Sequence, residues 1–302
     1  MSEHPEVLES DRAPRTLPSR LGLVVHPTRA VDRPLRELRG WADGHGVDLV
    51  QVHAACDQRP VAEEGAAEEC DLIVAIGGDG TTLAAIHEGV IAARPVLAVA
   101  CGSLGILTSV PATAVAQALE RFSRGDWVPW LLPGLEIAGE LGTHLLALND
   151  LAVVRAGSGQ TRLSVEVDGS LFARIAGDGC IVSTPVGSSA YTLAAGGPLL
   201  TPGVDAFVIT PLPTHGGSRP PLVVGGSSSV RLQSAPGHWE ARLELDGQRV
   251  GTLDEPLVIT FCKAVATVIT FPAQEPMLTL LRRRGIITDS PRILVDDARR
   301  RG

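Results

Sequence analysis

The chain has 302 residues, of which 44% are hydrophobic and 20% charged, a composition typical of a folded protein long enough for two domains. Its formal net charge of −8 and aromatic content of 3% argue against a protein that binds nucleic acid or anionic membranes, because such proteins use basic surfaces and stacking rings. Five scattered cysteines without a CxxC pair indicate neither a disulfide framework nor a zinc site, and since no apolar run reaches the ~18 residues of a membrane span, we expect a cytoplasmic protein.

The first part of the chain alternates between apolar runs and helical patterns. Residues 1–19 are polar, include three prolines and are predicted to form a disordered leader. Between 20 and 132 we expect strands at 21–26, 47–52, 71–78 and 94–100, with helices at 34–46, 61–70 and 81–91. Strands that are almost wholly apolar and alternate with helices are typical of a parallel sheet covered on both faces. This region is therefore predicted to be a Rossmann-like α/β domain.

The second part has a different pattern. From 133 to 272, short runs alternate apolar and polar residues with period two and are interrupted by glycine or Asp-Gly pairs. This pattern predicts a β-rich, sandwich-like domain. The last segment, 273–302, contains "MLTLLRRRG", which predicts a helix that returns to the first domain.

The stretch "DLIVAIGGDGTTLAAI", residues 71–86, places a carboxylate between glycines at the end of a predicted buried strand. Glycines at the carboxyl end of a parallel strand, followed by a helix N-terminus, favour a phosphate site. Asp79 would repel phosphate there, unless a cation lies between them or the carboxylate accepts a proton from an attacking hydroxyl. The alternative interpretation is that Asp79 only caps a helix beginning at Thr81.

Two absences narrow the chemistry. Lys263 is the only lysine, so the chain has neither a P-loop nor the lysine of protein kinases, and the loop "HPTRA" after the first strand lacks a GxGxxG motif. Glycine amides, Mg²⁺ and arginine would then have to neutralise the phosphates. Residues 177–202 are rich in small and hydroxyl side chains, which favours an exposed ligand loop over a core strand, although a glycine-rich connection without a ligand would have the same composition.

Six motifs in this order resemble the NAD kinase family: "GGDGTTL" (77–83), "CGSLGILT" (101–108), "LND" (148–150), "DGCIVSTPVGSSAY" (178–191), "PLPTHGGSRPPLVV" (211–224) and "DGQ" (246–248). The resemblance implies a Rossmann-like N-terminal domain and a β-sandwich C-terminal domain. It also implies the transfer of a phosphoryl group from ATP or polyphosphate, with Mg²⁺, to the 2′-hydroxyl of the adenosine ribose of NAD, giving NADP. A homo-oligomer, dimer or tetramer, is expected, with no nucleic-acid or membrane partner.

The resemblance also implies roles for individual residues. Asp79 would be the general base, and the donor phosphates would be bound by Gly77, Gly78, Gly80 and Thr81. No side chain is implied as a direct metal ligand. The acceptor would be bound by Asn149, Asp150, Asp178, Val186, Gly187, Ser188, Ser189, Ala190, Tyr191, His215 and Gln248. A structural role for His215, and a role in the turn alone for Asn149 and Asp150, are the alternatives.

The sequence departs from the family pattern at four positions. Ala100 stands where the family usually has asparagine, Ile106 where it has phenylalanine, Ala176 where it often has a basic residue and Val186 where it has threonine. NAD is the leading acceptor. The alternatives are a kinase acting on another adenosine-like metabolite, a catalytically weak NAD(P)-binding regulator, and a lipid kinase, which the lack of a basic amphipathic helix disfavours.

Overall fold

The computed structural model describes residues 16–102, 105–216, 219–235, 241–272, 277–293 and 299–300. The chain divides into two units. The first comprises Met1–Thr82, Leu97–Val128 and Ile269–Gly302, and the second comprises Leu83–Val96 and Pro129–Val268. Most of the predicted leader lies outside the described residues. Ser19, at its end, is not disordered, because its backbone N–H and its hydroxyl donate to Asp71 Oδ2 at 2.6 and 2.8 Å.

The first unit contains a sheet with the strand order β2-β1-β3-β4-β5. β1 pairs in parallel with β2 and β3, and β4 pairs in parallel with β5. β1, β3 and β4 follow from apolar runs in the sequence, and β3 and β4 are buried along their whole length, whereas β2 reads DLVQ and is only partly buried. The bounds are β1 (Arg20–Val25), β2 (Asp48–Gln51), β3 (Leu72–Gly77), β4 (Val96–Ala100) and β5 (Val110–Pro111).

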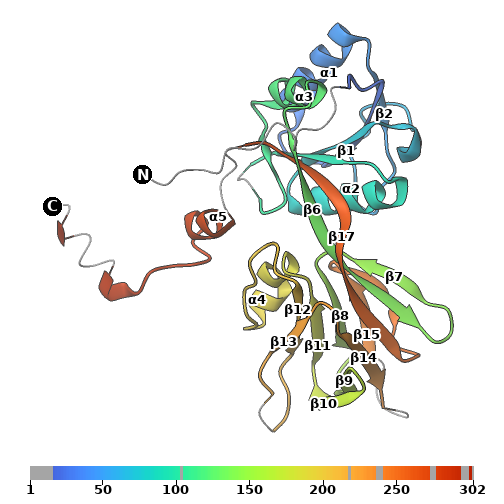
Figure 1. Cartoon of the computed structure of the whole chain (residues 1–302), viewed down its shortest axis with the longest axis vertical. Helices are drawn as coiled ribbons and strands as arrows, with labels where there is room; N and C mark the ends of the chain where they lie inside the picture. Colours follow the sequence, from blue (N-terminus) through green and yellow to red (C-terminus); the bar gives the residue numbers. More distant parts are fainter. Residues whose placement is uncertain are drawn as a thin grey trace. The chain divides into compact units, whose positions relative to one another are not determined.

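Helices α1 (Asp32–His45) and α3 (Val115–Ser123) pack on one face of this sheet and form a single apolar core with it (Figure 1). A helix predicted over 61–70 is wrong. Only the short 3-10 helix η2 (Ala67–Glu69) forms there, because the backbone at 63–65 pairs with Gln51: the Gln51 N–H donates to the Glu63 carbonyl at 2.7 Å and the Gly65 N–H donates to the Gln51 carbonyl at 3.0 Å. Helix α2 (Asp79–Ala92) begins in the first unit and continues into the second, and α5 (Met277–Arg283) belongs to the first.

The second unit is built from two sheets of mainly antiparallel strands. One has the order β13-β12-β11-β8-β15-β16, and the other contains β10-β9-β14-β17 together with β6 and β7. The bounds are β6 (Val128–Gly139), β7 (His144–Ala147), β8 (Asp150–Arg155), β9 (Thr161–Val167), β10 (Ser170–Gly177), β11 (Gly179–Ser183), β12 (Ala206–Pro211), β13 (Leu222–Gly225), β14 (Ser229–Ser234), β15 (Ala241–Leu245), β16 (Gln248–Thr252) and β17 (Leu257–Thr270).

The core of the second unit lies between these two sheets. Its buried side chains alternate along the strands, as in Leu163 and Val165 of β9 or Leu243 and Leu245 of β15. This is the period-two pattern expected of a sandwich, in which every second residue faces the opposite sheet. Two short helical segments, η3 (Gly187–Ser189) and α4 (Tyr191–Ala194), follow β11. The predicted combination of a Rossmann-like α/β domain with a sandwich-like β domain is confirmed.

None of the helices in the described part of the chain is long and apolar enough to cross a lipid bilayer.

Candidate functional site

The glycine turn after β3 is the tightest connection of the first unit. β3 ends at Gly77 and α2 begins at Asp79, so Gly78 alone joins the two elements. An added Cβ at Gly77 would lie 2.4 Å from Thr81 Oγ1, and one at Gly78 would lie 2.8 Å from Arg29 Nη1. Packing therefore requires glycine at Gly77, whereas at Gly78 the added atom would meet the end of the flexible Arg29 side chain, which can move. Gly80 differs, because a Cβ there would meet no atom within 4 Å, so its backbone is open to a ligand.

Asp79 lies at the first position of α2, and its carboxylate is oriented by a neighbouring loop. The backbone N–H groups of Ile106 and Leu107 donate to its two oxygens at 3.2 and 3.1 Å. Arg284 Nη1 lies 3.7 Å from Oδ2, and the side chain is 37% exposed. The alternative in which Asp79 caps a helix beginning at Thr81 is wrong, since α2 begins at Asp79 itself. The carboxylate is fixed in direction and still accessible to solvent.

Gly105 makes this arrangement possible, and the sequence analysis assigned it no role. An added Cβ at Gly105 would lie 1.8 Å from Asp79 Oδ1, so any side chain there would displace the carboxylate. The Gly105 N–H donates to Thr108 Oγ1 at 2.6 Å, which fixes the loop that supplies the two amides. The motif "CGSLGILT" therefore serves to orient Asp79; residues 103–104 within it lie outside the described part of the chain.

Arg29 is a second residue that the sequence analysis missed. It belongs to the loop after β1, and its Nη1 donates to the Cys101 carbonyl at 3.0 Å. His26 Nδ1 accepts from the backbone N–H groups of Thr28 and Arg29, both at 3.2 Å, so the loop is held in place. The guanidinium consequently lies against Gly78, and a positive charge stands beside the glycine turn. An arginine at the carboxyl end of a parallel strand was the available signal.

In the second unit, two of the predicted motifs meet at the segment 148–150. Thr184 holds this segment from one side, because its Oγ1 donates to the Leu148 carbonyl at 2.7 Å and its N–H donates to the Asn149 carbonyl at 2.9 Å. Gly187 lies so close that an added Cβ would be 1.9 Å from the Asn149 carbonyl oxygen. The glycine of "STPVGSS" is therefore required by backbone contact with the "LND" motif.

The start of β8 buries a carboxyl group. Asp150 is only 4% exposed. Its burial, together with the nearby carboxylates of Asp246 and Glu244, raises the pKa of Asp150 to about 7. Burial disfavours the charged form and like charges add to that effect. Both protonation states are thus populated near neutral pH, and this carboxyl can donate as well as accept hydrogen bonds.

The prediction of an exposed loop over 177–202 is wrong for its first half. β11 is buried from Gly179 to Ser183, because small residues there form a central strand between β8 and β12. Val186, Gly187 and Ser188 are buried as well, and the Ser188 hydroxyl donates to the Pro185 carbonyl at 2.6 Å. Of the predicted acceptor residues at 186–191, Ser189, Ala190 and Tyr191 reach the surface.

The remaining predicted acceptor residues lie in different surroundings. Asp178 pairs with Arg155, whose Nε lies 2.7 Å from Oδ1. Tyr191 is 39% exposed, and partial burial together with the carboxylates of Glu244, Asp150 and Asp178 raises its pKa. Tyr191 is thus near both Asp150 and Asp178. His215 and Gln248 are exposed, and the His215 N–H donates to the Ala176 carbonyl at 3.1 Å.

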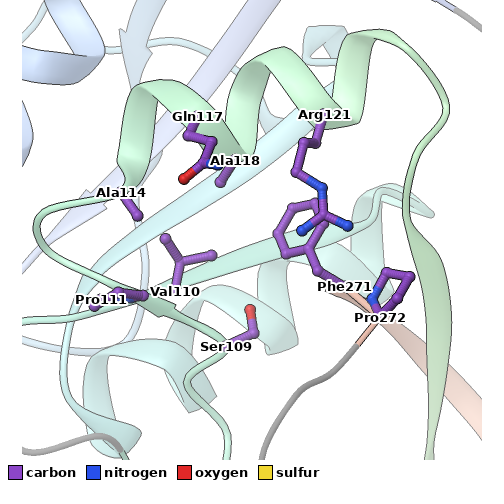
Figure 2. Close-up of a pocket in the computed structure, with 9 residues that line it drawn as sticks. All are labelled: Ser109, Val110, Pro111, Ala114, Gln117, Ala118, Arg121, Phe271 and Pro272. Atoms are coloured by element: carbon purple, nitrogen blue, oxygen red, sulfur yellow. The ribbon is translucent and has the colours of Figure 1, made fainter. Parts of the chain in front are cut away.

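A separate hollow of about 220 Å³ lies beside α3 (Figure 2). Arg121 is its one charged side chain, and that guanidinium already lies 4.5 Å from the centre of the Phe271 ring and bonds to Asp126 at 2.8 Å. None of the predicted site residues lines this hollow, so we do not assign the chemistry to it. Its wall is formed by Ser109, Val110, Pro111, Ala114, Gln117, Ala118, Arg121, Phe271 and Pro272.

Two family models match this chain, one in each of the two regions that contain the predicted site residues. The family model of the ATP-NAD kinase N-terminal domain matches residues 21–127, and that of the ATP-NAD kinase C-terminal domain matches residues 148–271. The chain belongs to the NAD kinase family. The predicted family membership is therefore confirmed, and the two matched regions contain the glycine turn and the 148–150 segment respectively.

Named relatives agree with this assignment. The chain is 37% identical to an NAD kinase of Acidobacterium capsulatum over 226 residues, which are 71% of this chain and 79% of that protein. It is 34% identical to an NAD kinase of Geotalea daltonii over 74% of this chain and 82% of that protein. A crystal structure of yeast NADH kinase complexed with NADH has a TM-score of 0.74 at 21% identity, covering 90% of this chain and 89% of that chain. An NAD kinase from Archaeoglobus fulgidus in complex with ATP has a TM-score of 0.70 at 22% identity, covering 89% and 100%. These two structures share the fold of the NAD kinase family with this chain.

The raised pKa of Asp150 predicts a pH-dependent gain in stability from Asp150→Asn. Because the folded state holds this proton up to about pH 7 and the unfolded state releases it near pH 3.8, ionisation of Asp150 destabilises the wild type progressively between these values. The neutral amide avoids that loss. The stability advantage of the variant should therefore grow by about 2–3 kcal/mol between pH 5 and pH 8 and stay flat above pH 8, at 1.36 kcal/mol per pKa unit.

Urea unfolding of both proteins at several pH values measures this difference, and titrations shared by the two proteins cancel. An advantage that is independent of pH would show that Asp150 is ionised in the folded protein at pH 5, contrary to its buried position.

Proposed function

We propose that this chain transfers the γ-phosphoryl group of ATP to the 2′-hydroxyl of the adenosine ribose of NAD, giving NADP. The observation that carries the proposal is the carboxylate of Asp79, which is held by two backbone amides at the start of α2, directly after a glycine turn, and remains accessible. Membership of the NAD kinase family supports the reaction class. The relatives named NAD kinase, and the fold shared with structures that contain NADH or ATP, support the two substrates.

In this reaction Asp79 acts as the general base. The ribose 2′-hydroxyl gives its proton to the carboxylate while its oxygen forms a bond to the γ-phosphorus, and the bond from that phosphorus to the bridging oxygen of ADP breaks. The amides of Ile106 and Leu107 hold the carboxylate oxygens in a fixed direction, so the base need not reorient during transfer. A base on a helix N-terminus also stands where the phosphates bind.

The phosphate charge is met by backbone and arginine rather than lysine. The open backbone at Gly80, the first amides of α2 and the Arg29 guanidinium against Gly78 all lie at the same turn. Arginine offers several N–H donors in a planar group, which suits phosphate oxygens. Gly80 is therefore proposed to bind the donor together with Arg29, while the buried Gly77, Gly78 and Thr81 shape the turn that presents these groups.

The residues also fit Mg²⁺ held mainly by the nucleotide. Across the residues that the structure describes, no three His, Cys, Asp or Glu side chains gather to form a metal site. Each oxygen of Asp79 accepts one backbone N–H, which leaves lone pairs available. Mg²⁺ commonly keeps several waters and is bound through substrate phosphates, so the phosphates of ATP would hold it and Asp79 would remain the base. The ion would supply neutralisation of the charge on the transferring phosphoryl group.

Asn149 and Asp150 are proposed to bind the acceptor ribose, with Ser189, Ala190 and Tyr191 around the nucleotide. A carboxyl group suits a vicinal diol because its two oxygens can pair with both hydroxyls. Purified protein, ATP, Mg²⁺ and a panel of nucleotides that includes NAD and NADH test the proposal, with mass spectrometry for one added phosphate. A product from another nucleoside and none from NAD or NADH would replace the proposed acceptor.

Asp79→Asn should lower kcat by about 10²-fold or more, the usual contribution of a general base, while NAD binding changes only a few-fold. The matched control is Asp43→Asn on the exposed part of α1, which should leave kcat unchanged. Steady-state kinetics with thermal unfolding of both variants measures this. Full activity in a less stable Asp79→Asn protein would mean that the carboxylate serves only the fold.

Gly105→Ala should lower kcat/KM by about 10²-fold with the Asp79 side chain still present, because the added methyl group would occupy the position of Oδ1 and turn the base away. Gly44→Ala is the control, since a Cβ there meets no atom within 4 Å. The same assay compares the two. Wild-type turnover by Gly105→Ala would show that the direction of the carboxylate does not matter.

An NAD analogue lacking the 2′-hydroxyl of the adenosine ribose should gain no phosphate, because the attacking oxygen is missing. Mass spectrometry of the reaction mixture detects any product, and unmodified NAD in a parallel reaction shows that the enzyme is active. Phosphate found on the 2′-deoxy analogue would move the reaction to a different hydroxyl and refute the proposed site of transfer.

A further inference from the structure

Asp246 occupies a tight turn, but its side chain does more than form that turn. It joins β15 to β16 together with Gly247, and both residues have positive φ values, +50° and +80°. Asp-Gly is a common pair in two-residue hairpin turns, because such turns need two residues that tolerate positive φ. Turn formation does not require the aspartate side chain to be buried. Here that side chain is only 3% exposed.

The Asp246 carboxylate is surrounded by donors from one short segment. The N–H groups of Asn149 and Asp150 donate to Oδ1 at 2.6 and 3.0 Å, and the N–H of Leu148 donates to Oδ2 at 2.9 Å. His87 Nε2 donates to Oδ2 at 2.7 Å. Three successive backbone amides thus converge on one carboxylate, an arrangement that binds anions strongly.

The same segment is held from its other side by contacts already described. Thr184 donates to the carbonyls of Leu148 and Asn149, while Asp246 accepts from their amides. The Asp246 N–H also donates to the Asp150 carbonyl at 3.0 Å. The backbone from 148 to 150 is therefore fixed through both its N–H and its C=O groups. The directions of the Asn149 and Asp150 side chains follow from that backbone.

We propose that Asp246 is the positioning residue of the acceptor site, holding Asn149 and Asp150 for the nucleotide with His87 of α2 as its partner. The inference rests on the proposed function, since it assumes that these two side chains bind the acceptor. Asp246 itself need not touch the substrate. Small displacements of binding groups are costly, because misplacement by about 1 Å can reduce turnover about 10²-fold.

Asp246 also affects the chemistry of its neighbour. Its negative charge, with that of Glu244, lies close enough to add to the effect of burial on the Asp150 carboxyl. Glu244 is paired with Arg242 at 2.6 Å, and His87 faces Asp246 from α2. Neutralising Asp246 should therefore lower the pKa of Asp150. A turn aspartate far from the segment, such as one that lies at the other end of the sheet, would have no such effect.

The chain supplies its own control. Asp168 lies with Gly169 in a second Asp-Gly turn, between β9 and β10, with φ values of +48° and +74°. It accepts from the Ser229 N–H at 2.9 Å and makes none of the contacts to the 148–150 segment. Asparagine tolerates positive φ as well as aspartate does, so Asp246→Asn and Asp168→Asn both keep their turns.

We expect Asp246→Asn to lower kcat/KM for NAD by about 10–100-fold and to change KM for ATP by less than about 2-fold, because only the acceptor side chains lose their support. Asp168→Asn should change neither value by more than about 2-fold. His87→Leu should show a smaller loss of the same kind, and His87→Gln, which keeps a donor, should recover part of it. Equal kinetics in the two asparagine variants, or equal losses for NAD and ATP, would overturn the proposal.

Two readouts that do not depend on turnover separate this inference from the proposed function. Amide hydrogen exchange at 148–150 should be faster in Asp246→Asn than in Asp168→Asn. The stability advantage of Asp150→Asn should stop growing at a lower pH when Asp246→Asn is also present, because the pKa of Asp150 in the folded protein is then lower. If the wild type does not phosphorylate NAD, the proposed function fails, and these two measurements still decide whether Asp246 holds the segment. Unchanged exchange at 148–150 would show that it does not, whatever the pH dependence.

Discussion

The polar backbone of residues 148–150 has to be satisfied inside the second unit, and much of the local structure follows from that requirement. Leu148 and Asp150 are buried, so their N–H and C=O groups cannot rely on water. Thr184 and Asp246 supply the missing partners from opposite sides. Gly187 is needed because this backbone passes too close for any side chain. Three separate motifs thus meet at one segment for reasons of hydrogen bonding and space.

In the first unit, backbone N–H groups bind a carboxylate that belongs to the candidate site itself. There the backbone of the 105–107 loop provides donors, and the side chain of Asp79 is the acceptor. Gly105 again marks the close approach. In each unit a glycine allows a close contact: Gly105 lies against the Asp79 carboxylate, and Gly187 lies against the Asn149 carbonyl. Each contact helps to fix the direction of a polar side chain. These glycines do not serve to make a loop flexible, because the packing around Gly105 and Gly187 leaves no room for a side chain.

The sequence allowed prediction of those features that depend on local pattern. The apolar runs of β1, β3 and β4 indicated a parallel sheet, and the glycines of the turn at Gly77–Gly80 were enough to single out Asp79. The region 177–202 was expected to be an exposed loop because it is rich in glycine and hydroxyl residues, whereas Gly179–Ser183 forms a buried strand that pairs with β8 and β12. The helix expected at 61–70 was wrong because its alanines and glutamates favour helix, while the backbone at 63–65 forms its hydrogen bonds with Gln51 instead.

The contacts that orient the site were beyond sequence reasoning for a different reason. Arg29 and Cys101, or His87 and Asp246, are far apart along the chain, and no spacing rule brings them together. The motif "DGQ" drew attention to Gln248, whereas the structure gives the buried contacts to Asp246 two residues earlier. Family resemblance located the motif correctly but did not distinguish the residue that faces solvent from the one that faces the segment.

The buried carboxyl of Asp150 has a consequence for anyone who engineers this protein. A group whose ionisation opposes folding is a natural target for a screen that selects only heat resistance, because its replacement stabilises the fold. Such a screen would enrich variants that have lost Asp150, which is proposed to bind the acceptor, and would present them as improvements. Selection for heat resistance in this fold therefore has to be paired at every round with selection for catalysis.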